Sequence, residues 1–202
     1  MKLNLMHVLQ CNASRSRQTS AEVAEISHKF DILLIQEPYT QSGVAMRIHG
    51  FDLHPFNTNG RVKSCTNVKP KILTSYGVSE YSSSNCCIIK KRFSDRNFYF
   101  ISAYIEPAND EHETLLNIIS FISLVPNSTI IVGGDFNADH TSWNCCYIDH
   151  RGTELVNFFE EINFYLLNDG TRTFQAVTHG TLRSFIIDLS AVSDHLTSRI
   201  TD

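Results

Sequence analysis

The sequence has no long hydrophobic run and no Cys/His spacing of the kind that holds zinc. Nowhere in its 202 residues do about eighteen apolar side chains follow one another. The amino terminus also lacks a sustained apolar region, so neither a membrane span nor a signal peptide is expected. The six cysteines include two adjacent pairs but no CxxC motif. In a chain of this size we expect free thiols rather than a disulfide framework or a structural zinc site.

An excess of positive charge is also missing, because the formal net charge is −4. Proteins that bind nucleic acid through counterion release are usually basic, so the composition alone does not indicate such a partner. It does not exclude one, since an enzyme with carboxylates around Mg²⁺ is acidic at its site and can contact phosphates locally. Arg15, Arg17 and the run Lys90-Lys91-Arg92 could make such contacts or could be solvated surface charges.

The pattern of apolar residues predicts an alternation of strands and helices. The expected strands cover 3–10, the stretch within 31–38, 129–135 and 185–192. The expected helices cover about 14–29, 111–124 and 152–162, with hairpins and long loops from 43 to 104. Ser14 is a candidate N-cap of the first helix. The composition, with 42% hydrophobic residues, is that of a soluble globular protein, and we expect one α/β domain over 1–202 with several antiparallel strand pairs.

Polar side chains follow the apolar strands at or near their ends. Asn12 follows the first strand, Glu37 the second, and Asp135 with Asn137 the strand at 129–134. Carboxylates and amides gathered at one edge of a sheet are what a hard divalent cation requires, because Mg²⁺ takes oxygen ligands and keeps waters for a substrate phosphate. The pattern therefore favours phosphoryl chemistry.

The segment Gly133-Gly134-Asp135-Phe136-Asn137-Ala138 is the sharpest signal in the sequence. Its glycines allow close backbone approach, its aspartate can orient or deprotonate a water, and its asparagine can bond a phosphate oxygen without adding negative charge. Taken alone, the segment could also be a glycine turn with an Asx cap. Its combination with Gln36-Glu37-Pro38 favours the catalytic interpretation.

Together, Gln36-Glu37 and Gly134-Asp135-Phe136-Asn137 resemble the endonuclease/exonuclease/phosphatase superfamily, which includes apurinic/apyrimidinic endonucleases and DNase-I-like nucleases. Further stretches are similar to the endonucleases of non-LTR (LINE-type) retrotransposons. These are Gln10-Cys11-Asn12 with Arg15-Ser16, Gln36-Glu37-Pro38-Tyr39, Ser102-Ala103-Tyr104, Asn137 through Trp143 with Arg151-Gly152, 167–171 and 184–190. The resemblance implies a DNase-I-like, four-layer α/β sandwich of two mixed sheets flanked by helices.

The resemblance also implies residue roles. Glu37 would be the principal ligand of Mg²⁺, for which Mn²⁺ could substitute, and Asp135 would position or activate the attacking water. The other implied catalytic residues would hold the water, the phosphate or a neighbouring group, and they are Asn12, Tyr104, Asn137 and Asp188. In this scheme Asp188 supports a phosphate-binding histidine. Alternatively, Tyr104 is an ordinary strand aromatic and Asp188 a capping acid. Trp143 and His140 are expected to anchor a loop.

The implied activity is a DNA nick with a free 3′-hydroxyl, which would start target-primed reverse transcription. The partners would be DNA and a fused reverse transcriptase domain, with no membrane. The location would be nuclear, inferred from the substrate, and otherwise intracellular and soluble. The alternatives are a decayed or non-catalytic DNA-binding domain and a phosphatase or phosphodiesterase of the same superfamily.

The chain departs from the superfamily pattern in two places. The closing Ser-Asp-His motif is matched only by Ser193-Asp194-His195, which begins five residues after Asp188. That spacing is too short, so we interpret the tripeptide as a chance similarity and expect the chain to be truncated at its carboxyl end, without the domain's final strand. Its activity is then uncertain. In addition, Ser14 stands where some relatives place an acid, which argues against a second metal site.

Overall fold

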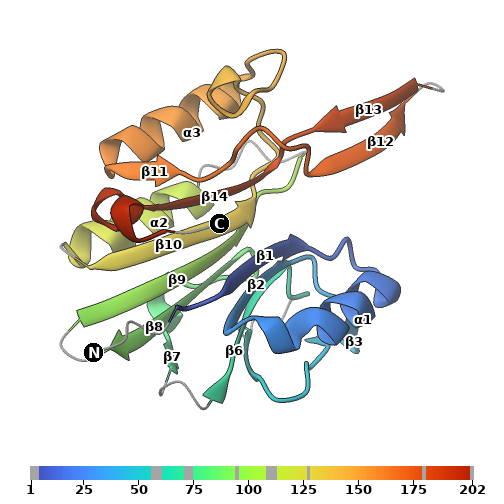
Figure 1. Cartoon of the computed structure of the whole chain (residues 1–202), viewed down its shortest axis with the longest axis vertical. Helices are drawn as coiled ribbons and strands as arrows, with labels where there is room; N and C mark the ends of the chain where they lie inside the picture. Colours follow the sequence, from blue (N-terminus) through green and yellow to red (C-terminus); the bar gives the residue numbers. More distant parts are fainter. Residues whose placement is uncertain are drawn as a thin grey trace.

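Two β-sheets lie face to face at the centre of the molecule (Figure 1). The computed structural model describes residues 5–55, 61–70, 75–93, 96–107, 113–126, 128–178 and 181–200. The four-stranded sheet has the order β1 (Val8–Asn12), β2 (Ile32–Gln36), β6 (Ser64–Val68), β5 (Asp52–Pro55). The six-stranded sheet has the order β11 (Phe164–Leu166), β14 (Asp188–Ser193), β10 (Thr129–Asp135), β9 (Arg96–Tyr104), β8 (Cys86–Phe93), β7 (Ser75–Gly77). Both are mixed, because β1 is parallel to β2 and β10 is parallel to β9, whereas β6 and β14 run antiparallel to their neighbours.

Helices cover the outer face of each sheet. Helix α1 (Arg17–Ile26) lies on the four-stranded sheet, where its Val23 belongs to one buried cluster with Leu33. Helices α2 (Glu113–Leu124) and α3 (His150–Glu161) lie on the six-stranded sheet, where Ile118 and Leu155 share a cluster with strand residues. Figure 1 shows the resulting layers, with α1 at the lower right and α3 at the upper left. The four-layer sandwich expected from the resemblance is therefore confirmed.

The apolar run of β2 is buried on both faces. Ile32 and Leu34 point between the sheets and pack in one cluster with Ile89 and Phe100. Leu33 and Ile35 point the other way, into the cluster under α1. Successive strand residues alternate in direction, so a strand with both faces covered needs consecutive apolar residues. This explains why the run closes with Gln36 and Glu37 only where the strand reaches the edge of the core.

Three predicted boundaries were wrong. The strand predicted over 3–10 is Val8–Asn12, and residues 3 and 4 lie outside the described part of the chain. Ser14 is not the N-cap; its φ of 47° places it in a left-handed turn, and Ser16 caps α1 by accepting a hydrogen bond from the Thr19 amide at 3.1 Å. The predicted late strand is divided between β13 (Thr181–Phe185) and β14. Strand β13 pairs with β12 (Phe174–Thr178) in a separate hairpin, which projects from the body in Figure 1.

The remaining elements are short. They are the hairpin of β3 (Thr40–Gln41) and β4 (Val44–Ala45) and the 3₁₀ turns Ser27–Lys29, Ser79–Tyr81, Thr141–Trp143 and Asp194–Arg199. All six cysteines are free thiols, as predicted. Within the described part of the chain, no helix is long and apolar enough to cross a membrane.

The run Lys90-Lys91-Arg92 is not a continuous basic surface. Lys91 points into the molecule and is fully buried. Its Nζ lies 5.6 Å from the centroid of the Phe93 ring and has no hydrogen-bond partner. Alternation along β8 therefore removes the central lysine from any phosphate-binding role.

Candidate active site

Five of the six candidate residues lie at or directly after strand ends on one edge of the two sheets, and Asn137 follows two residues after β10. Asn12 ends β1 and Glu37 follows β2 in the four-stranded sheet. In the six-stranded sheet, Asp135 at the end of β10 is in register with Tyr104 of β9 on one side and Asp188 of β14 on the other. The parallel strands end together, and the antiparallel strand begins there. Topology therefore brings together residues that are far apart in the sequence.

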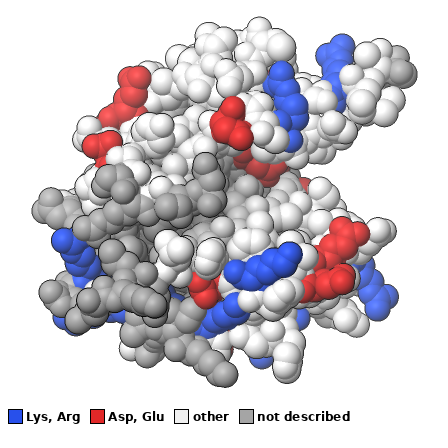
Figure 2. Space-filling view, viewed as in Figure 1, with Lys and Arg blue, Asp and Glu red and all other residues white. Residues whose placement is uncertain are grey.

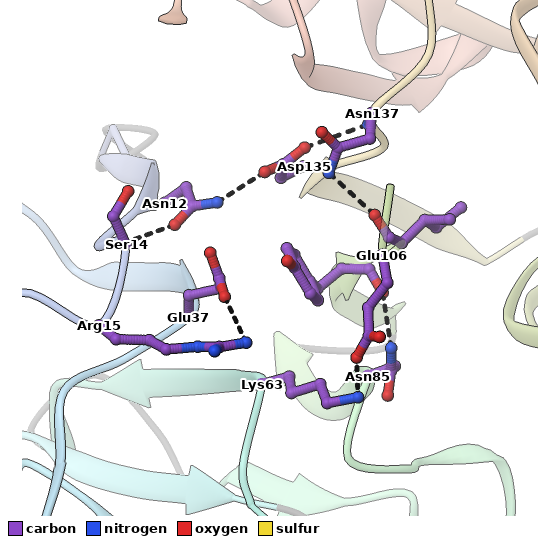
Figure 3. Close-up of polar contacts among 11 residues, drawn as sticks. Asn12, Ser14, Arg15, Glu37, Lys63, Asn85, Glu106, Asp135 and Asn137 are labelled. Atoms are coloured by element: carbon purple, nitrogen blue, oxygen red, sulfur yellow. Dashed lines mark hydrogen bonds and ion pairs between the residues drawn. The ribbon is translucent and has the colours of Figure 1, made fainter. Parts of the chain in front are cut away.

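A hydrogen bond between Asn12 and Asp135 joins the two sheets at this edge (Figure 3). Asn12 Nδ2 donates to Asp135 Oδ2 at 2.6 Å, and the Asn137 backbone amide donates to Asp135 Oδ1 at 3.1 Å. Asn12 is itself held, because its Oδ1 accepts from the Ser14 amide at 2.7 Å. Both oxygens of Asp135 are therefore fixed in direction, and the residue is only 3% exposed.

Two neighbouring carboxyl groups have raised pKa values. Burial raises the pKa of Asp135 to about 7, with a further contribution from the negative charge of Asp188, while the hydrogen bonds from Asn12 and Asn137 act in the opposite direction. Burial also raises the pKa of Asp188, whose Oδ1 accepts from Gln10 Nε2 at 3.1 Å. The site thus concentrates negative charge that its own hydrogen bonds offset only in part.

Glu37 faces Asp135 from the opposite sheet. Its Oε1 lies 2.7 Å from Arg15 Nη2, and its negative charge acts on the nearby Tyr104. Burial, followed by the charges of Glu37 and Asp135, raises the pKa of Tyr104 to about 12. Tyr104 is therefore a protonated donor at neutral pH, and its place in the site argues against the ordinary strand-aromatic alternative.

A buried polar network lies beneath these residues, between the sheets. Gln10 Nε2 donates to Gln36 Oε1 at 2.7 Å, and Gln36 Nε2 donates to Ser102 Oγ at 2.8 Å. Ser102 Oγ also accepts from Ser64 Oγ at 2.8 Å. The roles of these residues and the pairing of Arg15 with Glu37 were not predicted. The available signal was polar side chains at the ends of otherwise apolar strands.

The two glycines lie inside β10, so the glycine turn of the alternative is wrong, whereas Asp135 Oδ1 does accept from the Asn137 amide as in an Asx turn. A Cβ on Gly134 would overlap the carbonyl oxygen of Ala103 in the neighbouring strand, and one on Gly133 would lie 2.9 Å from Leu34 Cδ1 in the opposite sheet. Close packing of β10 on both sides thus requires glycine. Asn137 follows at a φ of 47°, and its Nδ2 donates to the Ile105 carbonyl at 2.9 Å.

Ser193-Asp194-His195 is not part of this site. Because β14 is antiparallel to β10, Asp188 lies opposite Asp135, whereas Val192 lies opposite Ile131. His195 Nε2 is 3.2 Å from Thr129 Oγ1, at the first residue of β10. The tripeptide therefore lies at the far end of the strand, which agrees with its interpretation as a chance similarity.

Trp143 anchors the loop after β10. It is buried, and its Nε1 donates to the Ala138 carbonyl at 3.2 Å. The His140 ring packs against it, with 5.3 Å between centroids. These contacts are structural, as expected for both residues.

The donor set fits one hard cation that keeps most of its waters. Among the described residues, no three His, Cys, Asp or Glu side chains form a ligand cluster. Mg²⁺ is often held by one or two carboxylates and completes its shell with water and substrate oxygens. The Glu37 side chain, which is 16% exposed, offers such a carboxylate near Asp135 and Asp188, the two carboxyl groups with raised pKa values. Figure 2 shows acidic atoms in the hollow below the projecting hairpin.

A two-sheet sandwich with carboxylates and amides at one edge defines the endonuclease/exonuclease/phosphatase superfamily of metal-dependent phosphodiesterases, and the resemblance is confirmed. Residues 98–202 match the sequence profile described as endonuclease-reverse transcriptase, and the chain belongs to this family. No curated protein gives a significant sequence match.

Solved structures agree with this assignment. The endonuclease domain of TRAS1, a telomere-specific non-LTR retrotransposon, has a TM-score of 0.86 at 25% identity, with 98% of this chain and 90% of that chain covered. The AP endonuclease LMAP from Leishmania major has a TM-score of 0.72 at 10% identity, covering 98% and 81%. The 3′ phosphatase NExo from Neisseria has a TM-score of 0.67 at 12% identity, covering 98% and 90%. At their low identities, the last two support the fold alone.

Proposed function

We propose that this chain is a Mg²⁺-dependent DNA endonuclease that leaves a 3′-hydroxyl for target-primed reverse transcription. The observation that carries the proposal is the Asn12–Asp135 hydrogen bond across the sheets, with Glu37 facing Asp135. It places a fixed carboxylate of raised pKa opposite a candidate metal ligand. A nuclease needs both groups within one site.

Asp135 is the candidate base for the attacking water. Burial raises its pKa above that of an exposed aspartate, which makes the carboxylate a stronger base for a water proton. Asn12 and the Asn137 amide fix the direction of its oxygens. Asp188 accepts a hydrogen bond from Gln10, and its negative charge raises the pKa of Asp135. In this proposal it also supports the groups that bind the phosphate.

Tyr104 is the candidate donor to the phosphate. Its hydroxyl stays protonated at neutral pH, because burial and the charges of Glu37 and Asp135 raise its pKa to about 12. Glu37 would hold the cation, with Mn²⁺ as a substitute for Mg²⁺. When bound, such a cation stabilises negative charge on the phosphate and on the leaving 3′-oxygen. Asn12 and Asn137 then serve as neutral groups that position the water or phosphate.

Two observations favour DNA as the substrate. The family is that of endonuclease-reverse transcriptases, and the TRAS1 domain belongs to a telomere-specific retrotransposon. The β12–β13 hairpin projects at the site end of the molecule, since β13 ends three residues before Asp188. Its Val177 is 72% exposed, which makes it a candidate contact for a large substrate. A fused reverse transcriptase and a nuclear location follow from this proposal.

The position of His195 favours a non-catalytic DNA-binding domain as the second candidate. It lies beside Thr129, at the opposite end of β10 from Asp135, and cannot assist Asp188. A binding-only domain would keep the fold and the DNA-contacting surface without turnover.

The test is nicking of supercoiled plasmid in Mg²⁺ by the unmodified chain, Asp135→Ala and Glu160→Ala. Glu160 is an exposed acid of α3 and serves as the matched control. We expect the unmodified chain and Glu160→Ala to nick equally, and Asp135→Ala to lose at least about 100-fold. Extension of the nick by a DNA polymerase checks for the 3′-hydroxyl.

The remaining outcomes separate the alternatives. Plasmid binding in a gel-shift assay with no nicking by any variant would establish the binding-only domain. Release of phosphate from a 3′-phosphorylated oligonucleotide without plasmid nicking would instead indicate a phosphatase. Nicking that survives in Asp135→Ala would reject the role of Asp135.

A further inference from the structure

Arg15 binds Glu37 through both its side chain and its backbone. Its Nη2 lies 2.7 Å from Glu37 Oε1, and its amide donates to the Glu37 carbonyl at 2.7 Å. The Arg15 side chain is 41% exposed and the Glu37 side chain 16%. Figure 3 shows the guanidinium lying along the carboxylate, on the Glu37 side of the site. A positive charge of the chain itself therefore occupies the carboxylate proposed to hold the metal.

The backbone on both sides of this ion pair is in the left-handed region. The φ angles are 47° at Ser14, 57° at Arg15 and 43° at Glu37. Residues other than glycine rarely adopt this conformation, and where they do the surrounding structure holds them there. Here the Ser14 amide is bonded to Asn12 Oδ1 at 2.7 Å, and the Glu37 amide donates to the Lys63 carbonyl at 2.7 Å. The contact between Arg15 and Glu37 is thus built into the turn.

The cation and the guanidinium would both bind the Glu37 carboxylate. Arg15 Nη2 already contacts Glu37 Oε1 at 2.7 Å. A cation that binds this oxygen must therefore share or replace the contact with Arg15. It also experiences repulsion from the guanidinium, which cannot lose its charge at any relevant pH. Competition for the carboxylate and repulsion by the guanidinium would both act in the DNA-free protein.

We propose that Arg15 competes with a divalent cation for the Glu37 carboxylate and so weakens the metal site. This inference rests on the proposed function, in which Glu37 is the metal ligand. Arg15 is then a positioning residue. It orients the Glu37 carboxylate through their ion pair, and its positive charge opposes cation binding.

The test measures Mn²⁺ affinity of the DNA-free protein, by electron paramagnetic resonance of free Mn²⁺ and by calorimetry. Five proteins are compared: the unmodified chain, Arg15→Ala, Arg15→Lys, Arg17→Ala and Glu37→Gln. We expect Arg15→Ala to bind Mn²⁺ about fivefold more tightly, which corresponds to the interaction of a partly exposed charge pair. Arg17, an exposed residue at the start of α1, controls for loss of a nearby positive charge and should leave the affinity unchanged.

Arg15→Lys keeps the charge but not the planar fork, so its affinity should lie between those of the unmodified chain and Arg15→Ala. It also serves as the test variant if Arg15→Ala fails to fold, which thermal unfolding reveals. Equal or weaker Mn²⁺ binding by Arg15→Ala, with binding lost in Glu37→Gln, would overturn the inference and leave Glu37 as the ligand. If Glu37→Gln binds Mn²⁺ as well as the unmodified chain, or if no protein binds it, the assignment of Glu37 fails and this inference fails with it.

Discussion

At the scale of single residues, Asp135 combines two properties that usually oppose each other. It is nearly inaccessible to solvent, which disfavours its charge, yet two hydrogen bonds orient it as an acceptor. Burial and the charge of Asp188 together outweigh these bonds and raise its pKa from 3.8 to about 7. The raised pKa suits a base but lowers the stability of the metal-free fold, because ionisation is easier in the unfolded chain.

Asp135→Asn is therefore expected to stabilise the metal-free protein at high pH. A carboxyl with a raised folded-state pKa imposes no penalty below about pH 4 and an increasing one up to about pH 7. At pH 8 in EDTA, removal of this penalty, less one lost hydrogen bond, should raise the free energy of unfolding by roughly 1–3 kcal/mol. Thermal and urea unfolding at pH 4 and pH 8 measure the effect. An equal difference at both pH values would contradict the assignment of the pKa.

The sequence was sufficient to choose candidate residues that lie at one edge of the sheets, but not to describe their pairing. Glu37 and Asp135 could be selected because each follows an apolar strand, and such ends meet at one edge of a sheet. The pairing of Arg15 with Glu37 could not be predicted, because it depends on the left-handed turn at Ser14 and Arg15. Such a turn is uncommon for these residue types. The expectation of a missing final strand stays a prediction.

At the scale of elements, β10 is a strand whose neighbours approach too closely for side chains at two positions. Gly134→Ala would place a methyl group against the Ala103 carbonyl oxygen of β9, which is backbone and cannot rotate away. We expect a loss of about 2–4 kcal/mol in unfolding free energy and reduced nicking, since Asp135 is the next residue.

The matched control is Gly77→Ala in β7, where an added Cβ meets nothing within 4 Å. It should change the stability by less than about 0.5 kcal/mol. Urea unfolding of both variants gives the comparison. Equal stability of Gly134→Ala and the unmodified chain would show that β9 and β10 separate more easily than this packing allows.

The predicted elements agreed best with the structure where the spacing of apolar residues follows the period of a buried strand or a helix. Strand β2 was recognised from its four consecutive apolar residues, and α2 from the helical spacing of Leu115 and Ile118. The division of the late strand was missed, because Phe185 and Leu189 are both apolar although they belong to different sheets. Local sequence does not specify which sheet a strand joins.

At the scale of the whole molecule, the two sheets are joined by an apolar layer over most of their length and by polar groups near the site. Gln36 is fully buried and bonds to Gln10 in its own sheet and to Ser102 in the other. Gln10 continues the network to Asp188. The network therefore connects the packing of the sheets with the position of Asp188, a carboxylate of the candidate site.

This network predicts a non-additive response to Gln36→Leu and Ser102→Ala. Gln36→Leu removes one hydrogen bond each from Gln10 and Ser102, which keep their bonds to Asp188 and Ser64, and we expect it to cost about 1–3 kcal/mol of unfolding free energy. Ser102→Ala removes one acceptor from the Gln36 amide, which keeps the Gly133 carbonyl at 3.3 Å, and should cost about 1–2 kcal/mol. In the double variant the shared bond is lost only once, so its cost should fall at least about 0.5 kcal/mol below the sum. Urea unfolding completes the cycle, with Ser123→Ala on the exposed face of α2 as the serine control. Strict additivity would mean that the Gln36–Ser102 hydrogen bond between the sheets contributes no coupling energy, and that the two residues act on stability independently.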